Sequence, residues 1–256
     1  LFFRAVCSFK MAPQPPTVLI TGANRGIGLG FVRHFLGKQD VKHVFAATRS
    51  PSDATDLKAI SDGRLHIVKL DVEDDNSIIS AEKEISRVVG DLGLSLLVNN
   101  SGVALPYDIE KPDREAVNKT LSVNVTGTII TTQVFLPLLR RAASRLSSSP
   151  VGVGRAAIVN VSSGAASISD NKSGGYLAYR ASKSALNSLT KTFAVDLAQD
   201  NILAVSILPG YVKTRMTGDK GELTVEQSVE MMTSAVETYG KEHSGGFYGK
   251  DGKPFP

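Results

Sequence analysis

A group of residues able to move a proton lies in the segment 174–189, which reads GGYLAYRASKSALNSL. Tyr179 and Lys183 are four positions apart, so on a helix they share one face and lie about 6 Å apart along its axis. Tyr176 shares that face too, but it lies about 10 Å from Lys183 along the axis. Helical phase alone therefore leaves either tyrosine as the candidate partner of the lysine.

A glycine-rich turn forms a second group of candidates. The sequence TGANRGIG (21–28) directly follows an apolar run and opens a predicted helix. Gly22 permits a tight turn, while Gly26 and Gly28 let the backbone and the helix start approach a pyrophosphate group. The spacing differs from the usual GxGxxG pattern, and many glycine-rich segments are only turns. Its position after the first strand of an α/β pattern predicts a dinucleotide site.

Two arginines bear on which dinucleotide this site binds. Folds that prefer NAD usually place an acidic residue at the end of the second strand, where it holds the ribose 2′-hydroxyl. Here that strand ends AATRSP, with Arg49 and no acidic residue before Asp53, and Arg25 lies in the glycine turn itself. Two guanidinium groups suit a 2′-phosphate, so we expect NADP (NADPH) as the cofactor. The alternative interpretation is two solvated surface arginines.

The chain alternates apolar runs with helical patterns, and these elements must position the candidates. Unbroken apolar runs indicate strands of a parallel sheet that helices cover on both faces. We therefore predict an α/β fold: a Rossmann-type, doubly wound parallel sheet in three α/β/α layers, with its ligand at the carboxyl ends of the strands. The predicted strands are 17–21, 43–48, 65–72, 94–100, 156–162 and 202–209, and the predicted helices are 25–37, 74–89, 112–145, 176–199 and 224–239.

The composition is that of an ordinary globular protein. The 256 residues are 42% hydrophobic and carry a net charge of +4, and we expect a single domain over residues 17–256. The basic residues are scattered, and neither a basic helix nor an RNA-binding aromatic motif occurs, so we expect no nucleic-acid partner. The histidines lack metal-ligand spacing, and no run of about 18 apolar residues occurs, so we expect neither a metal site nor a membrane span.

The first residues differ from the rest of the chain. Residues 1–10 contain two basic residues and no acidic one, as a transit-peptide fragment would. We favour the simpler interpretation that residues 1–16 are an N-terminal extension, disordered or added upstream of a natural start at Met11. Cys7 is the only cysteine, so no internal disulfide can form, which favours a reducing, cytoplasmic location.

Seven motifs occur in order over nearly all of residues 17–215. They are TGxxxGIG, LDV (70–72), NNSG (99–102), VNVTG (123–127), IVNVSS (158–163), YxxxK and PGYVKT (209–214). Together they resemble the short-chain dehydrogenase/reductase family, and this combination is highly specific. The tyrosine segment and the ending GGFYGKDGKP are similar to sniffer-type carbonyl reductases and C-factor-like proteins.

The resemblance implies which side chains are catalytic. Its YxxxK unit falls on Tyr179 and Lys183, and a phenol of pKa about 10 is a poor acid at neutral pH unless a cation within one helical turn lowers that pKa. Tyr176 lies too far away for this effect, so we expect it in the wall of the substrate pocket. Ser163 would donate a hydrogen bond to the substrate carbonyl. Its competitor Ser162 would point to the opposite face of the strand.

The resemblance also implies the other roles. Asn124 would anchor a water that links Lys183 to solvent, Asp71 would hold the adenine amino group, and Asn99 would brace the sheet. Thr214, with the backbone of a neighbouring valine, would hold the nicotinamide carboxamide. The expected cofactor-binding residues are Gly22, Asn24, Arg25, Gly26, Ile27, Gly28, Arg49, Asp71, Val72, Asn100, Gly102, Tyr179, Lys183, Pro209, Gly210, Val212 and Thr214.

The implied function is an NADPH-dependent carbonyl reductase that transfers hydride from nicotinamide to an aldehyde or ketone, with Tyr179 as general acid. The alternatives are an NAD(P)-dependent alcohol or steroid dehydrogenase working oxidatively, and a non-catalytic NADP-binding signalling protein. Little chain separates the PG turn from the last helix, so we expect an open pocket for varied carbonyl substrates, with residues 105–107 in its wall. In the family the helices corresponding to 112–145 and 176–199 often pair two subunits, so we expect a homodimer.

Overall fold

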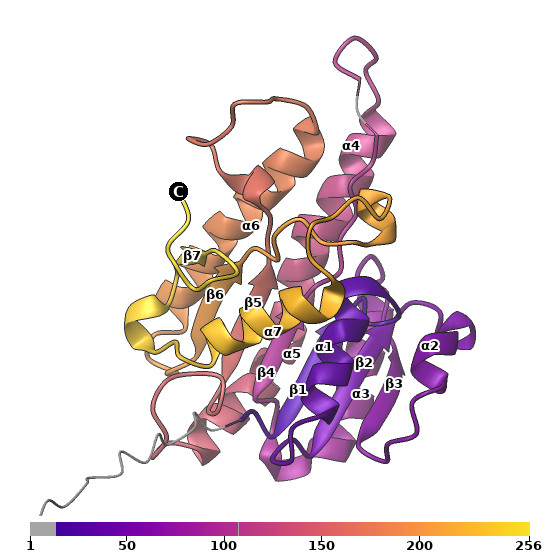
Figure 1. The fold of residues 1–256 in the computed structure, drawn as a ribbon. Coiled ribbons are helices and arrows are strands. Elements are labelled where there is room, and N and C mark those ends of the chain that lie inside the picture. The colour runs from indigo at the N-terminus through magenta and orange to yellow at the C-terminus, as the bar shows by residue number, and fades with distance from the viewer. Residues whose placement is uncertain (1–13, 107) are drawn as a thin grey trace, which may run out of the picture.

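The computed structural model describes residues 14–106 and 108–256, so the predictions for residues 1–13 and for Tyr107 lie outside the described residues. Its centre is a seven-stranded sheet in the order β3-β2-β1-β4-β5-β6-β7, in which all neighbouring strands run parallel (Figure 1). This confirms the predicted doubly wound fold. The strands are β1 (Thr17–Thr21), β2 (His43–Thr48), β3 (Leu65–Lys69), β4 (Leu96–Asn99), β5 (Ala157–Val161), β6 (Leu203–Ile207) and β7 (Phe247–Tyr248).

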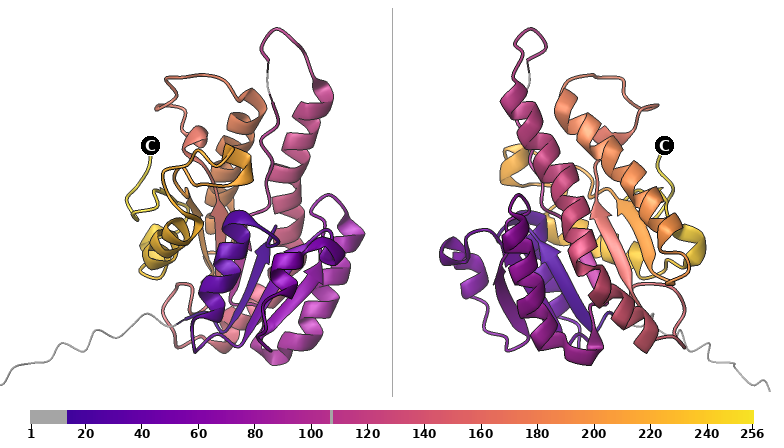
Figure 2. Two further views of the ribbon diagram at one scale, coloured as in Figure 1. Left: turned by 45° about the vertical axis from the view of Figure 1, so that its right-hand side comes forward. Right: turned by 180° about the vertical axis from the view of Figure 1, so that it is seen from behind.

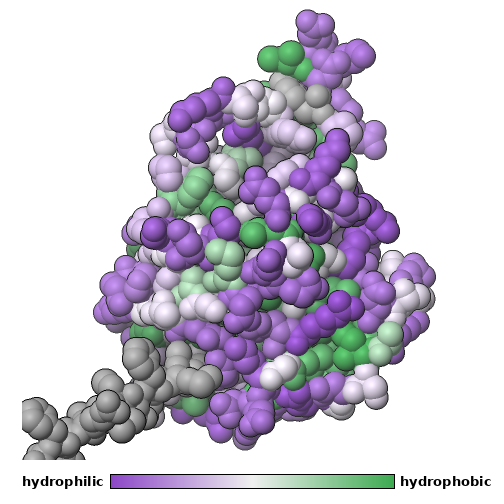
Figure 3. Space-filling view, in the orientation of Figure 1, coloured by the Kyte–Doolittle hydropathy of each residue, from purple (hydrophilic) through white to green (hydrophobic). Residues whose placement is uncertain are grey.

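Helices cover both faces of the sheet, as Figure 2 shows from two sides. Successive strand residues point to opposite faces, so neighbours such as Leu19 and Ile20 are buried in two different apolar cores. The core around Ile20 includes side chains of α1, α2 and α7, and the core around Leu19 includes side chains of α3 and α5. The helices are α1 (Gly26–Leu36), α2 (Thr55–Lys58), α3 (Asp75–Val89), α4 (Arg114–Leu121), α5 (Gly127–Arg145), α6 (Leu177–Asp196) and α7 (Val225–Val236), and short 3₁₀ turns lie at Pro51–Asp53, Gly90–Leu92, Gly164–Ala166, Arg215–Thr217 and Lys241–His243. Hydrophilic residues dominate the surface seen in Figure 3, as expected when the apolar faces are buried.

Three features differ from the predicted elements. The helix predicted over 112–145 consists of α4, a π-helical turn at Ser122–Thr126, and α5. A π turn adds a residue without interrupting the apolar pattern, so periodicity does not reveal it. The elements α2 and β7 were not predicted, because elements of four and two residues are too short to show a period.

The stretch Arg114–Arg145 is the one helix within the described residues that is long and apolar enough, by length and composition, to cross a membrane. Only 44% of its most apolar part is buried inside the protein. Its buried part packs on the sheet through Phe135, Leu138 and Leu139, which belong to the core around Leu19. A core helix of an α/β protein passes the same test, so this stretch adds no argument for a membrane span.

The strand order reverses between β1 and β4, and the ends of these two strands are tied together. The hydroxyl of Thr21 accepts hydrogen bonds from the backbone N–H groups of Asn100 and Ser101, each 3.0 Å long. The side-chain amide of Asn100 donates to the carbonyls of Thr21 (2.9 Å) and Gly22 (3.2 Å). Folds of this kind bind their ligands at such a reversal, at the carboxyl edge of the sheet.

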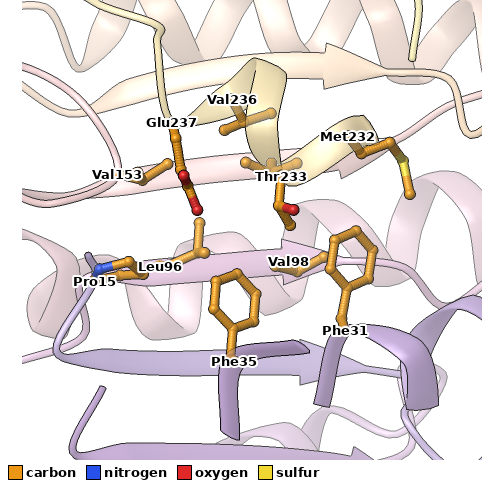
Figure 4. A pocket seen from close by; sticks show the side chains of 11 residues that line it. Pro15, Phe31, Phe35, Leu96, Val98, Val153, Met232, Thr233, Val236 and Glu237 are labelled. Carbon is orange, nitrogen blue, oxygen red and sulfur yellow. The ribbon is translucent and has the colours of Figure 1, made fainter. Parts of the chain in front are cut away.

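A cavity lies between the sheet, α1 and α7 (Figure 4). Phe31 and Phe35 reach it from α1, Met232 and Val236 from α7, and the Glu237 carboxylate points toward it. Most of its lining side chains belong to the core around Ile20, and none is a predicted site residue. We therefore interpret this cavity as a void in the core.

Candidate active site

The turn over residues 21–28 has a backbone that requires glycine. Gly22 and Gly26 have φ angles of +63° and +52°, which side chains disfavour. At Gly28 a Cβ atom would lie 2.3 Å from the carbonyl oxygen of Gly22. Because α1 begins at Gly26, the N–H groups of its first turn have no acceptor within the helix. This turn, which includes Asn24 and Ile27, therefore fits a pyrophosphate group.

Arg25 and Arg49 are both exposed at the same edge of the sheet. Arg25 precedes the first residue of α1, and Arg49 follows the last residue of β2. β2 pairs with β1 in a register that sets Ala47 beside Thr21. Arg49 follows Ala47 by two positions, so it lies beyond the end of β1, beside the glycine turn. The two guanidinium groups are thus available to a second phosphate beside the pyrophosphate cradle.

Asp71 and Val72 follow β3 at this edge. The Asp71 carboxylate accepts a hydrogen bond from the backbone N–H of Glu73 (3.1 Å), and the Asp71 backbone N–H donates to the hydroxyl of Ser77 (3.0 Å). A Cβ at Gly127 would lie 2.7 Å from the carbonyl oxygen of Val72, so the start of α5 packs directly on this loop. These contacts hold the Asp71 carboxylate at the predicted adenine end of the site.

Asn99 takes part in a buried polar network beneath the site. Its amide donates to the hydroxyl of Thr132 (3.1 Å) and to the Oδ1 atom of Asn160 (2.9 Å). The amide of Asn160 donates in turn to the hydroxyl of Thr190 (2.8 Å). The network joins β4 and β5 to α5 and α6, as a bracing residue would.

Ser163 lies next to Tyr179, although 16 positions separate them in the chain. Ser163 follows β5, Tyr179 is in the first turn of α6, and the Ser163 hydroxyl is close enough to the phenol to lower the pKa of Tyr179. The Ser163 hydroxyl also accepts a bond from the backbone N–H of Ala165 (3.2 Å). Ser162 is buried, and its hydroxyl donates to Oδ1 of Asn187 (2.8 Å). The structure thus brings Ser163, and not its competitor, to the tyrosine.

Lys183 is buried one helical turn from Tyr179. Its ammonium group donates a hydrogen bond to the carbonyl of Val161 (2.8 Å) and lies 5.9 Å from the centre of the Tyr179 ring. Burial lowers the pKa of Lys183 to about 8. A Cβ at Gly102 would lie 3.3 Å from Oδ1 of Asn124 and 3.6 Å from Nζ of Lys183, so this glycine lets the loop after β4 pass close to both side chains.

The prediction that a cation lowers the pKa of Tyr179 was wrong for the protein as described. Burial raises this pKa, because the charged phenolate loses its contact with water, and the nearby Ser163 hydroxyl opposes the rise by a smaller amount. The Lys183 ammonium bonds to the backbone of Val161 instead of the phenol oxygen. Tyr179 therefore keeps its proton at neutral pH.

The loop after β6 completes the site. Gly210, which follows Pro209, has a φ angle of +79°, a conformation that favours glycine. Val212 is buried and Thr214 lies beside the glycine turn, with its methyl carbon 3.6 Å from the position of a Cβ on Gly26. The predicted site residues therefore lie at strand ends, on the loops that follow the strands and in the first turns of α1 and α6, except Asn124, which lies in the π-helical turn between α4 and α5.

A family model described as short chain dehydrogenase matches residues 16–224. The chain belongs to the short-chain dehydrogenase family. It is therefore an oxidoreductase. An uncharacterized oxidoreductase of Schizosaccharomyces pombe is 31% identical to it over 266 residues, which cover 96% of this chain and 100% of that protein.

Two solved structures are similar to this short-chain dehydrogenase over nearly their whole length. The carbonyl reductase Sniffer of D. melanogaster superposes with a TM-score of 0.92 and 38% identity, covering 94% of this chain and 99% of that one. The NADPH-bound carbonyl reductase from chicken fatty liver has a TM-score of 0.90 and 36% identity, with the same coverage. The similarity to the sniffer type that the motifs indicated is thus confirmed.

Two polar residues close to Tyr179 in the chain were not among the predicted site residues. Ser182 is completely buried and links Tyr179 to Asn124 by hydrogen bonds. Arg180 donates to the carbonyls of Gly174 and Gly175, each at 3.1 Å, and so holds the loop that precedes α6. Their positions next to the tyrosine were the available signal, but a sequence does not show which partners such side chains meet.

Exposed apolar side chains surround the site of this short-chain dehydrogenase. Tyr176 is 59% exposed and has a left-handed φ of +49° directly before α6, three positions before Tyr179. Leu105, predicted as a pocket wall, lines an open hollow beside α4. Five exposed apolar residues on the loops after β5 and β6 and at the start of α6 are called the apolar rim below: Ile168, Tyr176, Leu177, Tyr211 and Met216.

Proposed function

We propose that this protein is an NADPH-dependent carbonyl reductase, which transfers hydride from nicotinamide to an aldehyde or a ketone. The observation that carries the proposal is the pairing of the Ser163 and Tyr179 side chains beside the buried Lys183, at the sheet edge that also holds the phosphate cradle. The similarity to two carbonyl reductases, one of them NADPH-bound, supports it.

The cradle of the glycine turn fits the pyrophosphate of a dinucleotide, and the remaining predicted residues fit its other parts. Arg25 and Arg49 would bind a 2′-phosphate, which favours NADP over NAD. Asp71 would hold the adenine, while the backbone of Val212 and the side chain of Thr214 would hold the carboxamide. When bound, this cofactor supplies the hydride.

The side chains would supply the proton and stabilise the developing charge. Tyr179 holds its proton at neutral pH, so it can donate this proton to the carbonyl oxygen of the substrate. Ser163 would donate a hydrogen bond to the same oxygen. With a pKa of about 8, Lys183 is mostly protonated at pH 7, and its ammonium would stabilise the phenolate once it turns from the Val161 carbonyl, to which it is bonded in the protein as described. Asn124 would anchor the water that returns a proton.

The apolar rim supports a substrate whose carbonyl carries apolar substituents. Its five side chains come from the loop after β5, the start of α6 and the loop after β6, all at the carboxyl edge. Their exposure leaves the mouth open, which fits an enzyme that accepts varied aldehydes and ketones.

The test is the oxidation of NADPH and, separately, of NADH in the presence of aldehydes, diketones and quinones. We expect the protein to oxidise NADPH, and we expect Tyr179→Phe to lower the rate of this oxidation by about 10²–10³-fold. Tyr176→Phe is the matched control, and its rate should fall far less. Comparable losses in both variants would refute the assignment of Tyr179. Faster oxidation of an alcohol with NAD would instead support the oxidative dehydrogenase.

We also propose that the protein is cytoplasmic and forms a homodimer. Leu121 on α4 and Val195 on α6 leave 36% and 63% of their surface exposed, which favours a further contact along these helices. Sedimentation of the purified protein tests the dimer, and fractionation of cells tests the location.

A further inference from the structure

The last eight residues, 249–256, double back along β7 and form what we call the tail. The backbone N–H of Gly249 donates to the carbonyl of Lys253 (2.8 Å), and that of Phe255 donates to the carbonyl of Phe247 (2.9 Å). The rings of Phe247 and Phe255 meet edge to face, with their centres 5.3 Å apart. Backbone and ring contacts together fix the position of Phe255.

The tail contacts both loops that bound the site. The Cζ atom of Phe255 lies 3.9 Å from the position of a Cβ on Gly164, the residue directly after Ser163. On the other side, Cδ of Lys250 lies 2.9 Å from the position of a Cβ on Gly210. Because both loop residues are glycines, no side chain separates the tail from the loops. Figure 1 shows the C-terminus rising beside β7.

The parallel sheet explains how the end of the chain reaches the site. β7 pairs parallel to β6, with Phe247 beside Ser206, so both strands end at the carboxyl edge. The loop after β6 contributes Gly210 and Thr214 to the site, and the tail leaves β7 at the same edge. The Phe255 ring is only partly buried, which leaves part of its apolar surface free for a ligand.

We propose that Phe255 is a specificity-determining residue, whose ring forms the wall of the substrate pocket next to Ser163. The inference rests on the proposed function and names its substrate class: carbonyl compounds with a bulky aromatic substituent. An aromatic ring at this position adds apolar contact to such a substituent and adds little to a small aliphatic one. One apolar contact in a pocket discriminates between substrates by about 10–200-fold.

The first test compares a large and a small substrate in the full-length enzyme. We expect Phe255→Ala to lower kcat/KM for phenanthrenequinone about tenfold while kcat/KM for diacetyl and KM for NADPH change less than about twofold. Phe255→Leu should recover part of the loss. Val88→Ala, which changes an exposed apolar residue near the end of α3, is the control and should change neither. Equal effects of Phe255→Ala on both substrates, or no effect, would overturn the proposal.

The second test measures by fluorescence whether the tail lies close to the bound cofactor, and it does not require catalysis. The chain contains no tryptophan, so Phe255→Trp introduces a single fluorophore whose emission the reduced nicotinamide absorbs. Val88 lies about 20 Å along the axis of α3 from the start of that helix at the carboxyl edge, so Val88→Trp is the matched distant reporter. We expect NADPH to quench Phe255→Trp several-fold more than Val88→Trp, and phenanthrenequinone to quench Phe255→Trp further.

The two tests separate failure of this inference from failure of the proposed function. If the intrinsic fluorescence of NADPH shows binding but both reporters are quenched equally, the tail is not part of the pocket. If NADPH does not bind the wild-type protein, the proposed function fails. The position of Phe255 is then tested by adding phenanthrenequinone without NADPH. Stronger quenching of Phe255→Trp than of the distant reporter supports a pocket wall at Phe255, and equal quenching of both overturns it.

Discussion

The side-chain amide of Asn124 donates a hydrogen bond of 2.9 Å to the hydroxyl of Ser182. That hydroxyl donates in turn to the carbonyl of Tyr179 (2.7 Å), and Ser182 has no exposed surface. The side chain of Asn124 also pairs with both backbone groups of Val103. One serine therefore joins the π-helical turn and the loop after β4 to the first turn of α6, which carries the proposed acid.

We predict that Ser182→Ala lowers kcat about tenfold and leaves KM for NADPH within about twofold. The substitution removes the acceptor of the Asn124 amide and the donor to the Tyr179 carbonyl, and an unsatisfied buried polar group costs about 1–3 kcal/mol. Steady-state kinetics over a range of pH measure the effect. A displaced tyrosine should also shift the pH profile of kcat, whereas a general loss of stability would not.

Ser188→Ala provides the control for this prediction, since Ser188 lies on the exposed face of the same helix. It should match the wild-type protein in kcat and in its pH profile. If Ser182→Ala behaves as Ser188→Ala does, the serine has no part in positioning Tyr179.

The buried ammonium of Lys183 should reduce the stability of the cofactor-free protein. Burial lowers the pKa of Lys183 from 10.5 to about 8, so between these pH values the unfolded chain binds a proton that the native protein does not. The free energy of unfolding therefore rises with pH between pH 8 and 10.5. Below pH 8 the lysine is protonated in both states, and its burial lowers the free energy of unfolding by a constant amount of roughly 3 kcal/mol. Lys183→Met removes the titrating group.

Urea unfolding at several pH values between 7 and 10 measures this contribution. We expect Lys183→Met to be more stable than the wild-type protein at pH 7, with a difference that shrinks toward pH 10. The control Lys83→Met changes an exposed lysine on α3 and should show no such trend. A difference that does not vary with pH would contradict the role of desolvation.

The strands were predictable because their apolar character comes from burial on both faces, which also determines the parallel arrangement. The strands beginning at Thr17 and His43 have the predicted bounds, and the other four predicted strands are shorter by two or three residues. The glycine positions were predictable too, because tight turns and close approach leave few other choices. The backbone geometry at these glycines depends on the local sequence, so the sequence alone indicates it.

The π-helical turn and the partners of polar side chains were not predictable in this way. Ser182 and Asn124 lie 58 positions apart, and nothing local in either segment specifies their hydrogen bond. The protonation of Tyr179 also escaped prediction, because its burial and the direction of the Lys183 ammonium depend on the packed structure. Tertiary contacts determine these features.

Arg25 and Arg49 should determine the choice between NADP and NAD. Each alanine substitution should raise KM for NADPH about tenfold, since a charge-assisted hydrogen bond to a phosphate is lost, and should leave KM for NADH nearly unchanged. Arg49→Glu should reverse the preference, because an acidic residue there can hold the ribose 2′-hydroxyl. Arg33→Ala on the exposed face of α1 is the control. Equal changes in KM for NADPH and for NADH would show that these arginines do not bind the 2′-phosphate.

Gly28→Ala should prevent cofactor binding by closing the cradle. The added Cβ would lie 2.3 Å from the carbonyl oxygen of Gly22 and 2.7 Å from Nδ2 of Asn100, so the turn must move away from the helix start. We expect Kd for NADPH to rise at least tenfold, measured by the fluorescence of NADPH, and Tm to fall by several degrees, since overpacking costs about 1–3 kcal/mol. Gly63→Ala is the matched control, because a Cβ there would meet nothing within 4 Å. Unchanged NADPH binding in Gly28→Ala would mean that the dinucleotide does not bind against this turn.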